Sequence, residues 1–342
     1  MAYTTIDKPS DYFNTVLYTG NDGTGRSITG VGFQPDFVWV KDRSNVFDHG
    51  LFDAVRGATK ALNSNDTSAD DTISNSLTAF GSDGFTAGAN AIINGNNNNY
   101  ASWNWKANGT GSANTAGSTA TTVSANTTAG FSIVKWTGTS GNTTIGHGLG
   151  VIPSVVIAKN TGGSGTNWVV YHKDLSSGYY IKLNLANAQD NANAYFTADP
   201  TNSILSLTGN TAANSNGNNM IAYCFADVQG YSKFGSYIGN GNADGTFVYT
   251  GFSPAFILIK RADSTGRWVL WDSKRNTFNL MDNALFPNDS AVENDGYWKI
   301  DGLSNGFKIK DSEVEINASG GTFIYMAFAE NPFVTSTAIP AC

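Results

Sequence analysis

The chain has 342 residues, of which 40% are hydrophobic and 12% aromatic but only 14% charged. The hydrophobic content is sufficient for packed cores, and the length favours two or three domains over one. The net charge of −7, without any basic cluster, argues against nucleic acid or an anionic membrane as a partner, because phosphate binding needs clustered Lys and Arg.

The chain begins MAYTTIDKPSD, which lacks the basic region and apolar stretch of a secretory signal. No apolar run approaches the roughly 18 residues of a membrane span. We therefore expect a soluble protein made in the cytoplasm. Residues 1–12 form an N-terminal arm. We expect it to become ordered only against a neighbouring subunit or the particle, by adding to an exposed sheet edge; simple fraying of the terminus is the alternative.

A ten-residue phrase occurs three times: GFQPDFVWVK at 32–41, GVIPSVVIAK at 150–159 and GFSPAFILIK at 251–260. The copies also share an upstream aromatic residue and a closing segment, SWNWKA at 102–107, AYCFAD at 222–227 and YMAFAE at 325–330. This long-range periodicity predicts three repeats of about a hundred residues. The residues that define the repeat are Gly32, Pro35, Lys41, Gly150, Pro153, Lys159, Gly251, Pro254 and Lys260.

In each phrase, Gly and Pro form a turn that leads into an apolar run rich in β-branched and aromatic residues. Such a run is typical of a central strand that is covered on both faces. We expect the closing Lys to pack its stem while its charge reaches water. Short strand-like pieces separated by Asn-Gly and Asp-Gly turns surround each phrase. These patterns predict an all-β fold of three tandem β-sandwich, jelly-roll-like modules.

The predicted organisation follows from the repeat and from one connector that lacks charged and aromatic residues. We expect that connector, 108–130, to be flexible or extended, with part of it able to add an edge strand to the second module. The predicted segments are an arm at 1–12, repeat 1 at 13–107, the Gly/Ser/Thr/Asn-rich linker at 108–130, repeat 2 at 131–227, repeat 3 at 228–334 and a tail at 335–342.

The sequence offers no enzyme signature and no metal site. None of the three histidines has a second His or Cys at ligand spacing, and no HExxH, GxSxG or Walker motif is present. The stretch NGNADG at 240–245 resembles half of a calcium loop, but Gly251 stands where the bidentate Glu would be needed. We therefore expect no catalytic residue, no cofactor and no metal, and a hairpin turn at 240–245.

Two further patterns invite a functional interpretation. Asp53 and Arg56 in the first module match Asp272 and Arg275 in the third, whereas the second has YHKD at 171–174; an ion pair that braces a turn is the simplest account. NGNNNNYASW at 94–103 combines amides with aromatics, the side chains that hold sugars, although a solvated turn is the simpler explanation. The residues of this candidate glycan-contact loop are Asn96, Asn97, Asn98 and Tyr100.

These phrases, together with GYSKFGSYIGNGNADGTFVYTGFSPAF at 230–256, FIYMAFAENPF at 323–333 and the opening AYTTIDKPSDYFNTVLYTGN, resemble a known family. The chain is similar to the repeat modules of virion structural proteins from tailed, particularly marine, bacteriophages, of the tail-fibre or appendage type. The likeness covers about residues 2–334. It implies a non-enzymatic component of the particle, with no catalytic or ligand residues to transfer.

The resemblance leads us to expect a tail fibre or similar appendage that is located in the virion and contacts the host surface. Its partners would be other virion proteins and a host surface glycan or receptor, and we expect a homo-oligomer. A capsid decoration or head-fibre protein is the alternative, and a tail-associated polysaccharide depolymerase is a second one. The depolymerase would need a carboxylate cluster in a groove.

Overall fold

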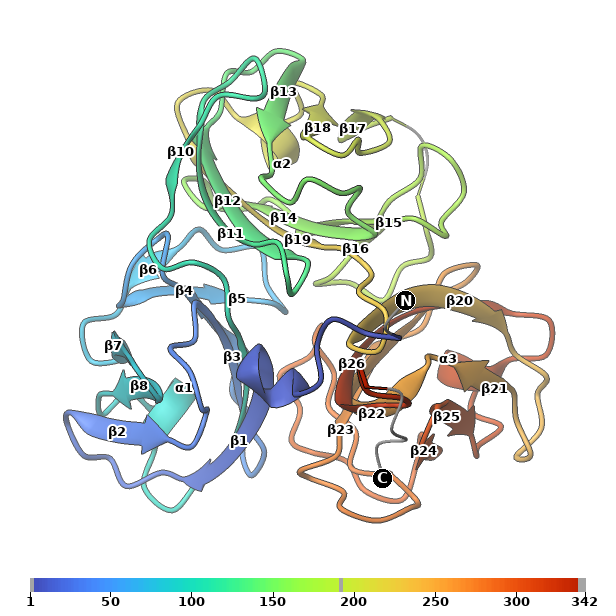
Figure 1. Ribbon diagram of the computed structural model, residues 1–342. Helices are drawn as coiled ribbons and strands as arrows, with labels where there is room; N and C mark the ends of the chain where they lie inside the picture. Colours follow the sequence, from blue (N-terminus) through green and yellow to red (C-terminus); the bar gives the residue numbers. More distant parts are fainter. Residues whose placement is uncertain (1–2, 191–192, 338–342) are drawn as a thin grey trace.

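The computed structural model describes residues 3–190 and 193–337, and it confirms the all-β prediction. Figure 1 shows three lobes that follow one another along the chain, each containing one larger and one smaller antiparallel sheet. None of the helices in the described residues has the length and apolar character needed to cross a membrane. We call these the first, second and third lobes, in chain order.

The first lobe begins after the short 3-10 helix η1 (Pro9–Asp11). Its large sheet has the order β1-β9-β3-β4-β5-β6 and its small sheet the order β2-β8-β7, with helix α1 (Ala91–Asn94) leading into β9. The strands are β1 (Phe13–Thr19), β2 (Arg26–Thr29), β3 (Phe37–Asp42), β4 (Gly50–Asp53), β5 (Lys60–Asn63), β6 (Asp71–Thr72), β7 (Leu77–Gly81), β8 (Gly84–Ala87) and β9 (Asn99–Trp105).

The second lobe has the largest sheet, with the order β10-β11-β12-β19-β14-β15-β16, and a small sheet with the order β13-β18-β17. Helix α2 (Thr211–Asn214) precedes β19. The strands are β10 (Ser112–Asn114), β11 (Thr121–Asn126), β12 (Phe131–Thr137), β13 (Thr143–Gly146), β14 (Val155–Asn160), β15 (Val169–His172), β16 (Ile181–Lys182), β17 (Phe196–Ala198), β18 (Ile204–Leu207) and β19 (Asn219–Phe225).

The third lobe has a large sheet with the order β20-β26-β22-β23 and a small sheet with the order β21-β25-β24. Helix α3 (Val314–Asn317) precedes β26. The strands are β20 (Ser232–Ile238), β21 (Phe247–Tyr249), β22 (Phe252–Arg261), β23 (Trp268–Asp272), β24 (Ile300–Leu303), β25 (Gly306–Ile309) and β26 (Thr322–Pro332).

Two kinds of core hold the lobes together. Within each lobe, side chains of the large and small sheets enclose a hydrophobic cluster. The opposite faces of the three large sheets meet in one central core shared by all three lobes. The repeated strands β3, β14 and β22 are therefore covered on both faces, and their apolar residues are buried, as their unbroken apolar runs predict.

The centre of the shared core is built from the closing aromatic residues of the repeats. The rings of Trp105, Phe225 and Phe328 lie 6.3, 5.6 and 5.9 Å apart between centroids. Phe37 and Phe256, each two residues past a repeat proline, pack against Trp105 at 5.2 and 5.6 Å. Segments more than a hundred residues apart in sequence thus share one aromatic cluster, so the lobes form a single body.

Each lobe also donates a hydrogen bond to the backbone of a neighbour. The indole nitrogen of Trp168 donates to the carbonyl of Asn63 at 2.8 Å, and that of Trp268 donates to the carbonyl of Lys182 at 2.9 Å. In the first lobe His49 occupies the corresponding position. Its Nδ1 accepts from the Trp39 indole, so its Nε2 donates to the carbonyl of Phe286 at 3.0 Å. The contacts run second to first, third to second and first to third, and therefore close a ring.

All three repeats have a glycine fifteen residues before the repeat proline, and the structure explains why no larger residue stands there. A Cβ atom at Gly20, Gly138 or Gly239 would lie 2.0, 1.9 or 2.4 Å from a backbone carbonyl oxygen in the turn after α1, α2 or α3. No side chain fits at such a distance. The glycine therefore allows two loops of each lobe to touch.

Two sequence-based expectations concern the segments outside the repeats. Residues 108–130 contain β10 and β11, which extend the large sheet of the second lobe beside β12, so the edge-strand alternative describes this segment. The described part of the arm, residues 3–12, packs within the same chain, which corrects the expectation that it needs a neighbouring subunit. Ile6 is buried in the central core, and the Tyr3 hydroxyl donates to the carbonyl of Gly251 at 2.9 Å.

Candidate functional site

The three repeat lysines are fully buried, so the expectation that their charge reaches water is wrong. Each ammonium group lies inside a cage of carbonyl oxygens. Lys41 donates to Asp42 O at 2.6 Å, Lys159 to Thr166 O at 2.8 Å and Lys260 to Arg261 O at 2.7 Å. Two of these cages also use an adjacent lobe: Lys159 reaches Thr67 O at 3.3 Å, and Lys260 reaches Ala186 O at 3.2 Å.

Burial has a clear electrostatic effect on these lysines. Desolvation lowers the pKa of Lys41 and Lys159 to about 8 and that of Lys260 to about 7. Negative groups raise the pKa again only in part; for Lys41 they include Asp289 and Glu293 of the third lobe. The lysines thus sit where lobes meet and belong to the internal structure rather than to an exposed site.

The repeated Asp–Arg pattern braces a turn, as its simplest account predicts, and also links lobes. The Asp53 carboxylate accepts from the backbone N–H groups of Val55 and Arg56 and pairs with the Arg56 guanidinium at 2.5 Å. The same carboxylate accepts from the hydroxyl of Tyr223, in the second lobe, at 2.8 Å. In the third lobe Asp272 pairs with Arg275 at 2.5 Å and accepts from the indole of Trp103, in the first lobe, at 3.0 Å.

In the second lobe His172 occupies the position of these aspartates, because it pairs with Val155 as Asp53 pairs with Phe37 and Asp272 with Phe256. Its Nδ1 accepts from the backbone N–H of Asp174, so its Nε2 donates to the carbonyl of Tyr325, in the third lobe, at 3.2 Å. Burial lowers the pKa of His172 to about 4, which keeps the ring neutral.

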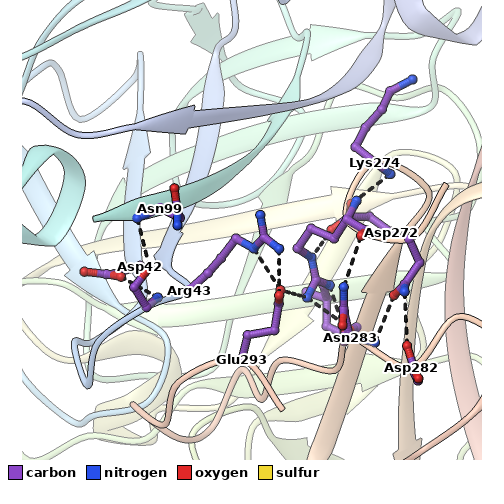
Figure 2. Close-up of polar contacts among 12 residues, drawn as sticks. Asp42, Arg43, Asn99, Asp272, Lys274, Asp282, Asn283 and Glu293 are labelled. Atoms are coloured by element: carbon purple, nitrogen blue, oxygen red, sulfur yellow. Dashed lines mark hydrogen bonds and ion pairs between the residues drawn. The ribbon is translucent and has the colours of Figure 1, made fainter. Parts of the chain in front are cut away.

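A polar network joins the first and third lobes around Glu293 (Figure 2). Its carboxylate accepts two hydrogen bonds from Arg43, at 2.9 and 2.7 Å, and one from Arg275 at 2.8 Å. The two guanidinium groups lower the pKa of Glu293 despite its partial burial. Arg43, Glu293, Arg275 and Asp272 thus form a series of alternating charges in which each group has an opposite partner. We interpret this network as a clamp between the two lobes.

The candidate glycan-contact loop is divided between exposed and internal residues. Asn96 and Asn97 are exposed, whereas the amide of Asn98 donates to Asp42 Oδ2 at 2.7 Å. Tyr100 is fully buried, stacks on Tyr18 and donates its hydroxyl to the carbonyl of Ala91. The structure thus corrects the prediction for Tyr100: its ring belongs to the core and has no face available to a sugar.

The segment 240–245 joins β20 to β21, which lie in different sheets and do not pair, so the expected hairpin is wrong. The turn is closed by its own side chains. Asn240 and Asn242 accept hydrogen bonds from backbone N–H groups two residues further on, and Asp244 pairs with Lys308 at 2.5 Å. Within the described residues, no group of three or more His, Cys, Asp or Glu side chains lies close enough to hold a metal ion. Cys224 is a buried free thiol, and desolvation raises its pKa to about 12.

A surface groove of about 440 Å³ lies between the arm and the third lobe. Tyr3 and Tyr249 stand on one side, and their hydroxyl oxygens are 3.4 Å apart. The remaining lining residues are Asp227, Gln229, Ser232, Lys233, Thr250 and Gly251. The groove thus combines an aromatic wall with a few polar side chains, which is the usual make-up of a small-molecule site.

The acidic residue of this groove is paired. Asp227 forms an ion pair with Lys173 and accepts from the Ser154 hydroxyl at 3.1 Å. Burial and the neighbouring Tyr249 raise the pKa of Tyr3 to about 12, so the Tyr3 phenol stays neutral at ordinary pH. The arrangement suits a ligand rich in hydroxyl groups better than a strongly charged one.

Sequence reasoning missed three buried asparagines at the ends of α1, α2 and α3. Asn94 donates to the carbonyls of Gly23 and Gly88, Asn214 to that of Gly141 and Asn317 to that of Asp311, so each holds the loops over its small sheet. Each lies eleven residues before the closing aromatic of its repeat. That constant spacing was a signal in the sequence that could have identified them.

Comparison with known proteins adds one finding. A family model, the domain of unknown function DUF7483, matches residues 8–332. A search of curated proteins found no significant match to the chain. Because the family model covers the end of the arm and all three lobes, we conclude that this chain belongs to the family of the domain of unknown function DUF7483.

Proposed function

We propose that the chain is a non-enzymatic virion structural protein, a tail fibre or similar appendage that contacts the host surface through the groove beside Tyr3 and Tyr249. The observation that supports this proposal is which segments of the sequence supply the groove residues. Apart from Asp227 and Gln229, they come from the opening stretch and from residues 230–256, the segments that carry the resemblance to appendage proteins.

The chemistry of the groove favours a host glycan as the ligand. Aromatic faces offer apolar contact to a sugar ring, and amide and hydroxyl side chains offer it hydrogen bonds. Gln229 is exposed and Lys233 half-buried at the groove, where both can contact a ligand. Because the charged groups are few and partly paired, we expect binding to depend only weakly on salt.

Binding of the purified protein to host cells and to isolated host glycans tests this proposal. Replacing Gln229 and Lys233 together by Ala should reduce binding at least tenfold, because both polar contacts are lost. Lys299→Ala, in the third lobe but outside the groove, is the matched control and should bind like the wild type. Equal binding by both variants would refute the groove as the attachment site.

The location on the particle separates the appendage from the capsid decoration alternative. An antibody against this chain, imaged on intact particles, should label the tail if the appendage proposal is right. Label on the head would favour decoration instead. Shortening of the bound host glycan during incubation would favour the depolymerase alternative.

A further inference from the structure

The outer edge strand of the small sheet has different surroundings in each lobe. The edge strands β2, β13 and β21 correspond to one another, because the buried residues Ile28, Ile145 and Val248 pair with equivalent positions of the adjacent strand. An uncovered edge strand exposes backbone groups that can pair with another chain, and proteins usually protect such edges. The three lobes therefore offer an internal comparison of how one edge is protected.

In the second lobe the chain covers this edge itself. Residues 117–119 run along β13, where Thr119 forms a parallel bridge with Ile145 and donates its N–H to the carbonyl of Thr144 at 3.0 Å. A Cβ atom at Gly117 would lie 2.3 Å from the same carbonyl oxygen, so the segment makes close backbone contact. The edge of this fold thus accepts an extended segment.

In the first lobe the edge is open and polar. Its two solvent-facing strand positions are Ser27 and Thr29, and Arg26 places a charged side chain beside them, with its guanidinium donating to the carbonyl of Thr19. Charge and hydroxyl groups on an edge discourage pairing with other chains. This lobe is therefore protected without a covering segment.

The third lobe has neither protection. Phe247 and Tyr249 replace Ser27 and Thr29, and they are 44% and 54% exposed. Ile238, at the end of β20, corresponds to Thr19 and is 56% exposed. Nine of the thirteen large exposed apolar side chains in the described residues belong to this lobe, which marks it as an interaction surface.

The backbone of β21 is oriented to receive a partner. Thr246 accepts a hydrogen bond from the N–H of Ile309 in β25, and hydrogen-bonding direction alternates along a strand. The polar backbone groups of Phe247 and Tyr249 therefore face away from β25. Outside the β21–β25 ladder, no backbone group of the described residues is bonded to either of them. In the second lobe, Thr144 corresponds to Phe247. Its carbonyl also points away from the adjacent strand, and there it accepts the hydrogen bond from Thr119.

We propose that this edge binds a second copy of the chain, with two β21 strands pairing antiparallel about a twofold axis at Val248. The axis places Phe247 opposite Tyr249 of the other copy, so the outward backbone groups of these two positions pair with each other. The order aromatic–valine–aromatic is the same when read in either direction, and isologous contact requires such self-complementarity. β21 carries no charged residue that a twofold axis would bring against its own copy.

Cross-strand aromatic pairs stabilise antiparallel strands, and Ile238 would be covered beside them. The partner is thus a second copy because the edge fits itself in register, in side-chain character and in charge. The inference does not rest on the function of the groove. Tyr249 also lines that groove, so dimerisation is tested by sedimentation alone, while the groove is tested through Gln229 and Lys233, which these variants leave unchanged.

Sedimentation velocity of the full chain at roughly 10 to 100 µM tests the proposal, since weak homodimers are populated in that range. The wild type should sediment as a dimer. Phe247→Lys with Tyr249→Lys should be monomeric, and so should Phe247→Glu with Tyr249→Glu. An equimolar mixture of the two variants should restore the dimer, because opposite charges then face each other. Restoration cannot be explained by misfolding.

Ser27→Lys with Thr29→Lys changes the corresponding edge of the first lobe and is the matched control. It should remain dimeric. A monomeric wild type throughout this range would overturn the proposal, and so would a dimer that persists in both charged variants. A mixture that stays monomeric, while each variant melts like the wild type, would show that β21 does not face its own copy.

Discussion

The second and third lobes use different side chains at the same position to make a hydrogen bond with the adjacent lobe. In the third lobe a buried carboxylate, Asp272, is held by Arg275 and by the Trp103 indole of the adjacent lobe. In the second lobe a neutral imidazole, His172, stands at that position and donates to a backbone carbonyl of the adjacent lobe. Leu175 replaces the arginine and packs into the central core.

The neighbouring lobes explain which solution is used. The residue two before the closing aromatic is Tyr223 or Trp103 where it faces an aspartate, and both of these donate a hydrogen bond. The third lobe has Met326 there, which cannot donate, and His172 bonds instead to the carbonyl of the preceding residue, Tyr325. A buried carboxylate would lack its donor at that contact, and an unpaired buried charge is costly. Each interface thus pairs a side-chain donor of one lobe with an acceptor of its neighbour: a carboxylate for Tyr223 and Trp103, and a backbone carbonyl for His172.

The largest expected effect comes from the aromatic cluster that all lobes share. Phe256→Ala should lower the free energy of unfolding by about 3–5 kcal/mol, because it leaves a cavity beside Trp105 and Phe328. Val155→Ala, at the same position of the second lobe, removes less volume and should cost about 2 kcal/mol. Urea denaturation measures both. A loss below about 1 kcal/mol for Phe256→Ala would contradict a shared central core.

Removing the carboxylate should separate the two kinds of interface. Asp272→Ala leaves the buried guanidinium of Arg275 with Glu293 as its remaining ion-pair partner, and we expect a loss of about 3–5 kcal/mol. His172→Ala removes one neutral hydrogen bond and should cost about 1–3 kcal/mol. Asp11→Ala, which breaks an exposed ion pair with Lys8, is the control and should be nearly silent. Equal losses at Asp272 and His172 would refute the distinction.

Acid should affect the histidine interface specifically. Burial lowers the pKa of His172 to about 4 from its ordinary 6.5, so between these values the unfolded chain binds more protons than the folded one. Stability should therefore fall as pH decreases from 6.5 to 4, by up to roughly 3 kcal/mol for this residue. Melting His172→Asn in parallel with the wild type isolates its share, because the other histidines are unchanged. Identical pH profiles would contradict the low pKa.

The smallest expected change at pH 7 comes from replacing a buried lysine. Desolvation lowers the pKa of Lys260 to about 7 in the folded state, while the unfolded chain keeps the ordinary value of 10.5. The unfolded chain thus binds more protons between these values, and stability should rise with pH across that range. Lys260→Met should flatten the rise and add on the order of 1 kcal/mol at pH 7. Lys299→Met, on a lysine without such a cage, should leave the slope unchanged.

The sequence by itself determined the strands, the repeat and the buried central phrase. Alternation, apolar runs and turn residues are local properties, so β3, β14 and β22 could be located from composition and spacing alone. The three-copy pattern also identified Phe37 and Phe256 as core residues, because a central strand must bury both faces. The turn-bracing role of Asp53 and Arg56 followed in the same way from their short separation.

Only the tertiary structure decided what the lobes do to one another. Whether Lys41, Tyr100 and the arm are buried depends on carbonyl groups and rings that are distant in sequence. No local pattern indicates that those groups lie nearby in the folded chain. The ring of contacts from His49, Trp168 and Trp268 arises for the same reason. An exposed edge at β21 likewise appears only once the position of residues 117–119 on β13 is known, because covering a sheet edge is a property of the folded chain.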